Sequence, residues 1–235
     1  MSTRAHHALL LTAVGSGAIT LREEILADSP DFYFRLGETS GLTAVNETGG
    51  TDGTYSGVTL NQSPLYIGGP SSVRVPGGVA WVAIPESLLP AATNLTLMCI
   101  INPQSVSGEQ AIIVRDNNIQ RYWQFRMSGT SLQWVKIVGG VEVVTKTSVF
   151  AINVTHMLHV VITAAGGVEF FLDGALIHTA TIGGTDYGGG TGGIRIGYDN
   201  GPTVGLNAYV SEVAGFSSVL TADRVLAHAE AAGFA

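Results

Sequence analysis

Residues 31–41, with the sequence DFYFRLGETSG, set the fold prediction for this chain. In an extended strand, Phe32, Phe34 and Leu36 share one face, whereas Tyr33 and Arg35 share the other. The first face is predicted to enter the core. The second places Arg35 across an outer sheet, where we expect it to pair with Glu38 or Glu212. The segment therefore predicts a scaffold strand and not an acid–base pair.

The rest of the chain continues as short β-branched and aromatic runs separated by Gly, Asn, Asp and Pro. This pattern is typical of antiparallel all-β proteins. The number of predicted strands requires two stacked sheets. Asp173-Gly174 predicts a two-residue hairpin, because such a turn needs positive φ, and Gly139-Gly140 suggests a second hairpin. The predicted strands are residues 32–36, 53–60, 72–75, 79–84, 95–101, 111–115, 122–127, 132–138, 141–147, 157–164, 168–172, 175–181, 194–197 and 206–216.

Helices are predicted only near the two ends of this β region. The first covers residues 21–28 and ends at Ser29-Pro30, and the second covers residues 221–232, between the capping Thr221 and Gly233. We expect residues 1–20 to form an N-terminal arm and residues 21–235 to form one sandwich domain. The apolar residues Leu9, Leu10 and Leu11 would dock the arm on another protein or a sister subunit. A weak secretory signal is the alternative interpretation of this arm.

Composition narrows the possible partners. The net charge is −7, and Lys136 and Lys146 are the two lysines, so no basic stripe is available for nucleic acid. No apolar run approaches the roughly 20 residues of a membrane span.

Cys99 is the single cysteine, which excludes an internal disulfide. The histidines lack cysteines at zinc-ligand spacing and are expected at the surface or half-buried, at positions 6, 7, 156, 159, 178 and 228.

Four segments, in this order, resemble the laminin-G-like branch of the concanavalin A-like lectin and glucanase superfamily. They are ILADSPDFYFRLGETSG (25–41), AVNETGGTDGTYSG (44–57), HMLHVVITAAGGVEFFLDGALI (156–177) and LNAYVSEVAGFSSVLTADRVLAHAEAAG (206–233). The resemblance implies a two-sheet antiparallel jelly-roll sandwich. It also implies glycan binding, protein adhesion or a passive role on a larger particle.

An opening helix followed by an Arg-Leu-Gly-Glu strand resembles bacteriophage tail or capsid-surface proteins. The leading hypothesis is therefore a non-enzymatic structural or adhesion protein on the virion surface, either a capsid decoration or a minor tail protein. The alternative is a carbohydrate-binding module, free and secreted or carried by a virion. A glycoside hydrolase is the third possibility.

The resemblance raises the question of calcium, because relatives often hold one structural Ca²⁺ between the early turn and the last strand. Asn46 stands where the family usually has Asp, and Ser211 stands where the last strand usually has Asp. Asn46, Glu47, Asp52, Ser211 and Glu212 would supply the remaining oxygens. The loss of two carboxylates predicts a weak calcium site or none, and no other cofactor is expected.

Glycan binding needs exposed aromatic rings beside planar hydrogen-bonding groups. The Gly-rich residues 183–193 and the turn at 198–201 offer Asp186, Tyr187, Tyr198, Asp199 and Asn200 as surface candidates. The aliphatic neighbours of Trp81 and Trp134 instead favour burial.

Catalytic signals are absent from the sequence. The glucanase string Glu-x-Asp-x-x-Glu does not occur, and neither does Gly-x-Ser-x-Gly. Glu169 and Asp173 lie four residues apart, but Asp173 is assigned to the hairpin turn, and Glu142 stands alone between valines. We therefore expect the chain not to be an enzyme.

Overall fold

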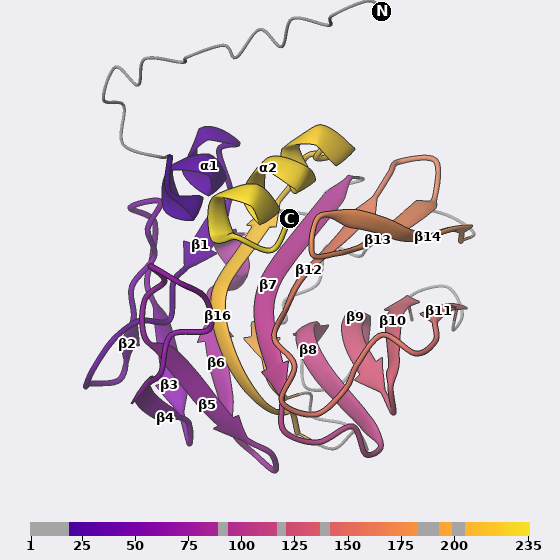
Figure 1. Cartoon of the computed structure of the whole chain (residues 1–235). Coiled ribbons are helices and arrows are strands. Elements are labelled where there is room, and N and C mark those ends of the chain that lie inside the picture. Colours follow the sequence, from indigo (N-terminus) through magenta and orange to yellow (C-terminus); the bar gives the residue numbers. More distant parts are fainter. Residues whose placement is uncertain (1–18, 89–93, 117–120, 137–141, 183–192, 199–204) are drawn as a thin grey trace, which may run out of the picture.

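A computed structural model describes residues 19–88, 94–116, 121–136, 142–182, 193–198 and 205–235. They form two antiparallel eight-stranded sheets that stack as a sandwich, with two α-helices over one end (Figure 1). This confirms the predicted all-β, two-sheet class with one helix near each end. Neither described α-helix is long and apolar enough to cross a membrane.

The first sheet, sheet A, has the order β14-β13-β12-β7-β16-β5-β4, and β1 also pairs with β16. The second sheet, sheet B, has the order β11-β10-β9-β8-β15-β6-β3-β2. The strands of sheet A are β1 (Phe32–Phe34), β4 (Thr59–Gln62), β5 (Ser72–Pro76), β7 (Leu95–Pro103), β12 (His156–Ile162), β13 (Gly167–Leu172), β14 (Ala175–Thr181) and β16 (Asn207–Phe216). The strands of sheet B are β2 (Thr43–Ala44), β3 (Gly53–Ser56), β6 (Trp81–Ile84), β8 (Glu109–Asp116), β9 (Arg121–Ser128), β10 (Ser131–Lys136), β11 (Glu142–Lys146) and β15 (Ile194–Ile196).

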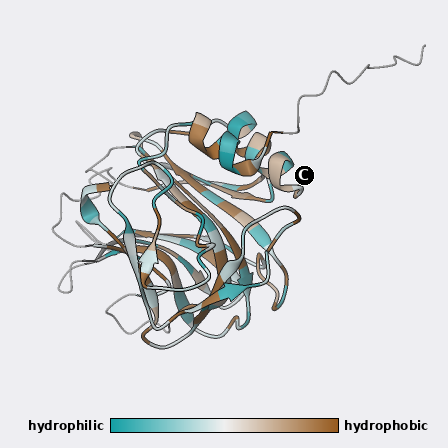
Figure 2. Ribbon diagram, turned by 90° about the vertical axis from the view of Figure 1, so that its left-hand side faces the viewer, coloured by the Kyte–Doolittle hydropathy of each residue, from teal (hydrophilic) through white to brown (hydrophobic). Residues whose placement is uncertain are grey.

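The main core lies between the two sheets. Phe32, Phe34 and Leu36 are fully buried in it, as the alternation of residues 31–41 predicts. Trp123 and Trp134 stack there with ring centroids 5.3 Å apart. Each large side chain of this kind contributes about 1.5–3 kcal/mol through removal of apolar surface from water. In Figure 2, much of the hydrophobic colour lies along the strands of both sheets.

A second apolar cluster lies between the outer face of sheet A and the helices α1 (Leu21–Ala27) and α2 (Ala222–Ala232). Tyr33 belongs to this cluster, so the other face of β1 is also buried. The second helix has the predicted caps, because Thr221 accepts from the backbone N–H of Arg224 and Gly233 ends it in the left-handed conformation. The first helix begins with a capping box of Thr20 and Glu23, which was not predicted. The two helices lie side by side (Figure 1).

Two histidines correct the prediction of surface or half-buried positions. His159 on β12 and His228 on α2 are fully buried, and their ring nitrogens Nε2 and Nδ1 lie 3.2 Å apart. The Nε2 atom of His228 lies 2.9 Å from a carboxylate oxygen of Asp28, which also accepts from Arg224. The physical reason is that α2 covers the outer face of sheet A and supplies partners for the rings. A sequence pattern does not reveal that cover.

Two strand predictions need correction, and one strand was missed. Residues 53–60 form two strands in different sheets, because Gly57 takes φ of +67° where the chain passes from β3 to β4. The strand predicted for residues 32–36 ends at Phe34, since Leu36 has φ of +58°. The two-residue strand β2 was not predicted at all. A 3-10 helix, η1 (Glu86–Leu88), follows β6.

The Asp173-Gly174 hairpin is confirmed. Both residues have positive φ, +51° and +85°, and they join β13 to β14. The strands β10 and β11 also pair, but Gly139 and Gly140 lie outside the described residues.

Candidate functional site

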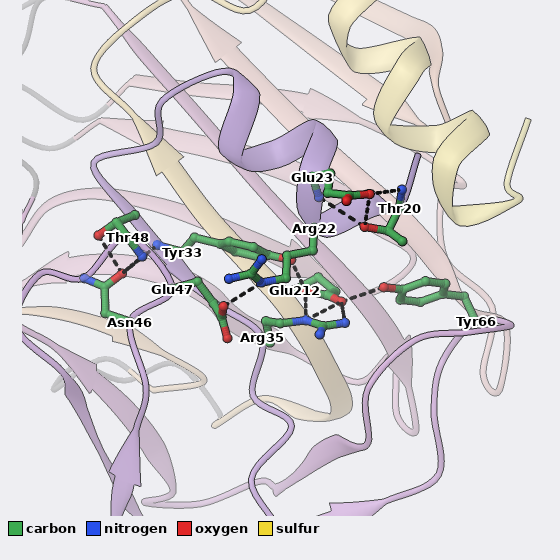
Figure 3. Close-up of polar contacts among 10 residues, drawn as sticks. All are labelled: Thr20, Arg22, Glu23, Tyr33, Arg35, Asn46, Glu47, Thr48, Tyr66 and Glu212. Atoms are coloured by element: carbon green, nitrogen blue, oxygen red, sulfur yellow. Dashed lines mark hydrogen bonds and ion pairs between the residues drawn. The ribbon is translucent and has the colours of Figure 1, made fainter. Parts of the chain in front are cut away.

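Arg35 pairs with Glu212, one of its two predicted partners (Figure 3). The Glu212 side chain is fully buried. Arg35 Nη2 donates to Glu212 Oε1 at 3.1 Å, and the hydroxyls of Tyr33 and Tyr66 each donate to this carboxylate at 2.5 Å. Glu38 instead accepts from the Tyr55 hydroxyl. Of the two partners expected for Arg35, the structure therefore selects Glu212.

Backbone geometry places Glu212 in this position. The register of β16 against β7 shifts between Ser211 and Ala214, and Glu212 has φ of +51° within that irregularity. A non-glycine residue at such an angle stores about 1–3 kcal/mol of strain. Packing around the carboxylate must therefore hold the bulge in place.

The charges and hydrogen bonds of this cluster are balanced among its own members, which indicates a structural role. Burial, followed by the Glu212 charge, raises the pKa values of Tyr33 and Tyr66, so both hydroxyls stay protonated as donors. Burial disfavours the charged guanidinium of Arg35, but the hydrogen bond and charge of Glu212 outweigh it and raise its pKa. One cation and two hydroxyls thus satisfy the carboxylate.

The residues predicted to bind calcium fall into two groups with different roles. Asn46 and Asp52 are together, because Asp52 Oδ1 accepts from the Asn46 backbone N–H at 2.9 Å. The Asn46 side chain accepts from the backbone N–H of Tyr33 at 3.2 Å and from the Thr48 hydroxyl at 2.9 Å. Glu47, expected with them, pairs with Arg22 at 2.7 Å.

Ser211 and Glu212 form the second group, on β16. The Ser211 hydroxyl is buried with no hydrogen-bond partner, and the Glu212 carboxylate is neutralised by Arg35. Among the described residues, no three His, Cys, Asp or Glu side chains gather as a metal site. These residues do not fit a calcium site, because the side-chain oxygens of Asn46 and Glu212 already accept hydrogen bonds from protein donors.

Tyr198 is the one predicted glycan-binding residue within the described chain. Its ring stacks on Trp81, with centroids 5.7 Å apart and planes 24° apart. The guanidinium of Arg195 lies over the Trp81 ring, 5.4 Å from its centroid. Asp186, Tyr187, Asp199 and Asn200 lie outside the described residues, as do Leu9, Leu10 and Leu11 of the arm.

The position of Trp81 corrects the sequence prediction of burial. Val82 and Ile84 point into the core, so alternation along β6 directs Trp81 to the outer face of sheet B, where it is half-buried. Both parities of residues 79–84 are apolar, and the pattern alone does not choose between them. Trp134, by contrast, is fully buried as predicted.

Sequence reasoning missed a row of polar side chains on the same outer face of sheet B. Arg126 on β9 donates to Gln133 on β10 at 2.8 Å and to Glu109 on β8 at 2.8 Å. Gln133 in turn donates to Thr145 on β11 at 3.1 Å. The available signal was the spacing of Gln124 and Arg126, two apart in a strand whose other parity is aromatic or apolar. We call the Trp81–Tyr198–Arg195 group and this row the sheet B face.

The sheet B face offers recognition groups and little catalytic machinery. The stacked rings, the Arg195 guanidinium and the Gln133 amide can bind a flat or hydroxyl-rich ligand. Arg126 is buried, and its guanidinium donates to Gln133, Glu109 and Gln124. Among the described side chains of the sheet B strands, Glu109 is the one carboxylate. It forms an ion pair with Arg126 at 2.8 Å. A two-carboxylate hydrolytic pair is not formed by these side chains.

The fold and this face define a lectin-like β-sandwich. Residues 76–226 match the concanavalin A-like lectin/glucanases superfamily, and the chain belongs to this family. This confirms the resemblance at the level of the family. A search among curated proteins gives no match.

Solved structures share the fold at low sequence identity. The binding domain of botulinum neurotoxin serotype D is 12% identical with a TM-score of 0.65, covering 86% of this chain and 52% of that one. The botulinum neurotoxin DC binding domain in complex with rat synaptotagmin II is 13% identical with a TM-score of 0.61, covering 86% and 51%. Trypanosoma rangeli sialidase is 12% identical with a TM-score of 0.61, covering 84% and 32%. The chain thus spans about half the length of these binding domains.

Proposed function

We propose that this chain is a non-enzymatic adhesion module that binds glycan through the sheet B face and is displayed on a bacteriophage virion. The observation that carries the binding role is the Trp81–Tyr198 stack with Arg195 over the Trp81 ring. Aromatic faces pack against the C–H groups of sugars, and guanidinium and amide groups bind their hydroxyls. Trp81, Tyr198 and Arg195 are all partly exposed, so a ligand can reach them.

Binding without catalysis is favoured by the single carboxylate, Glu109, among the described side chains of the sheet B strands. The similar neurotoxin structures are binding domains by name, which supports the same role. The sialidase is the counterexample among the similar folds. A glycoside hydrolase would need a second carboxylate about 5–10 Å from Glu109.

The virion part of the proposal is supported by the apolar arm and by the surface where it joins the domain. A cleft of about 380 Å³ at that point is lined in part by Ile19, Leu21, Ile67 and Ala231. Ile19 is 60% exposed and Ile67 is 99% exposed. Apolar groups of this kind favour contact with a sister subunit or another virion protein. A free, secreted module is the alternative for the same sheet B face.

Glycan binding is tested on a glycan array with the wild-type chain, Trp81→Ala and Arg195→Ala. Both substitutions are expected to weaken the strongest array signal at least tenfold, which corresponds to about 1.4 kcal/mol. Arg22→Ala is the matched control, because Arg22 pairs with Glu47 away from sheet B and should bind as the wild type does. Unchanged binding by both sheet B variants would remove this face from the proposal.

Virion display is tested by mass spectrometry of purified particles. The wild-type chain should be present, and a variant that lacks residues 2–18 should be lost from particles yet remain folded. This deletion keeps Thr20, whose side chain caps α1, since loss of a cap costs about 1 kcal/mol. Normal incorporation of the shortened chain would contradict docking through Leu9, Leu10 and Leu11.

A further inference from the structure

A second cleft lies on the outer face of sheet A, on the opposite side of the sandwich from the sheet B face. Its volume is about 340 Å³, within the range of small-ligand sites. Asn102 on β7 and Tyr209 on β16 are paired neighbours in the sheet and form part of its wall. Gln62, Gln104, Asn153 and Thr155 also line it. We call it the amide cleft.

The described lining of the amide cleft bears no charged side chain. The nearest cation on the sheet is Arg74, whose guanidinium lies over the Tyr209 ring, 5.2 Å from its centroid. That guanidinium donates to the Asn207 side chain and to the carbonyl oxygens of Val75 and Ala208, so its hydrogen bonds are used within the fold. A charged ligand would lose hydration here without gaining an opposite charge.

Hydrogen bonds hold two of the amides in fixed orientations. Asn102 Nδ2 donates to the Thr155 hydroxyl at 2.8 Å, and Gln104 Nε2 donates to Asn102 Oδ1 at 2.6 Å. This arrangement directs the donors of Gln104 toward the protein and leaves its Oε1 as an acceptor. Orientation fixed before binding lowers the entropy cost of binding.

Donors are available beside that acceptor. The Asn153 side chain and the Tyr209 hydroxyl make no hydrogen bond to any residue that the structure describes, although both line the cleft. Asn153 has φ of +63°, so its backbone is set by the turn before β12. The cleft therefore presents neutral donors and acceptors next to one aromatic ring.

We propose that the amide cleft is a second binding site, for a neutral saccharide. A sugar ring offers hydroxyls that both donate and accept, which matches uncharged amides and a phenol better than an ion does. The amide cleft is lined by residues of sheet A and the adjoining loops, so binding there does not depend on whether the sheet B face binds glycan. With both faces active, one chain would hold two glycans on opposite sides.

The experiment titrates the ¹⁵N-labelled chain with methyl glycosides of glucose, galactose, mannose and N-acetylglucosamine up to millimolar concentrations. At least one is expected to shift the side-chain amide signals of Asn102, Gln104 and Asn153 in a saturable way. Sialic acid and glucosamine, which are charged, should shift them less. If no neutral glycoside moves these signals, or if a charged sugar binds more tightly, the proposal is wrong.

Two variants assign the binding to this cleft. Gln104→Ala removes the oriented acceptor, and Asn153→Gly removes an amide while keeping a residue that accepts positive φ. Each substitution should weaken the affinity for the glycoside at least fivefold, whereas Gln133→Ala on sheet B should leave the affinity unchanged. Wild-type affinity in both cleft variants would overturn the proposal. Trp81→Ala should also leave this titration unchanged, which separates its outcome from that of the sheet B face.

Discussion

Replacement of Arg35 by Ala tests whether the segment at residues 31–41 is a scaffold. The Glu212 carboxylate is fully buried, and the Arg35 side chain is 28% exposed. Breaking a fully buried pair costs roughly 3–5 kcal/mol, because an uncompensated charge remains. Partial exposure of Arg35 and the two tyrosine donors reduce this to about 2–4 kcal/mol. For a chain of this size, the melting temperature should fall by roughly 5–15 °C.

The assay is chemical denaturation followed by circular dichroism, with Arg22→Ala as the control. Arg22 forms a closer ion pair with Glu47, at 2.7 Å against 3.1 Å for Arg35 and Glu212, but the Arg22 side chain is 42% exposed. Exposed pairs contribute about 0–1 kcal/mol, so the control should hardly change the free energy of unfolding. A loss of stability in Arg35→Ala no larger than that in Arg22→Ala would contradict the scaffold role of Arg35. Full stability together with loss of ligand binding in Arg35→Ala would contradict it as well.

Two further predictions concern the packing around sheet A. Burial and the proximity of His228 lower the pKa of His159 well below 6.5, and burial lowers the pKa of His228, so the fold favours both neutral rings. Stability should be full above the unfolded value near 6.5 and should fall by up to about 1.4 kcal/mol per pH unit per histidine below it. Melting curves of His159→Met should show a weaker acid dependence, and an unchanged dependence would contradict this assignment. Separately, a Cβ on Gly215 would lie 2.4 Å from the Phe32 ring, so Gly215→Ala should cost about 1–3 kcal/mol in denaturant unfolding. Gly193→Ala, where the nearest atom is 3.8 Å away, should change stability by less than about 0.5 kcal/mol, and equal losses in the two variants would refute the packing argument.

Strand alternation made part of the fold predictable from the sequence. Phe32 and Phe34 face the core because side chains in a strand alternate, and no tertiary information is needed for that inference. Strand alternation does not decide whether Arg35 pairs with Glu212 or with Glu38. The register that pairs Phe34 with Val213 brings β16 beside β1, and no local pattern specifies it.

The missed features share a physical cause, which is contact between segments distant in sequence. Trp81 lies between apolar neighbours of both parities, so only the position of β6 in sheet B shows which face it takes. His159 becomes buried because α2, far along the chain, packs above it. The amide cleft likewise joins residues of β4, β7 and β16 with the turn before β12. Residue propensities and hydrophobic periodicity describe single segments, so they do not predict contacts between segments that are distant in the sequence.

The most direct test of the sheet B proposal is a crystal structure of the chain with its strongest glycan from the array. The account predicts a sugar ring against the Trp81–Tyr198 stack, with hydroxyls bound by Arg195 or by the Gln133 amide. A glycan bound only at positions that touch none of Trp81, Tyr198 and Arg195 would contradict it. So would an array on which the folded chain binds no glycan.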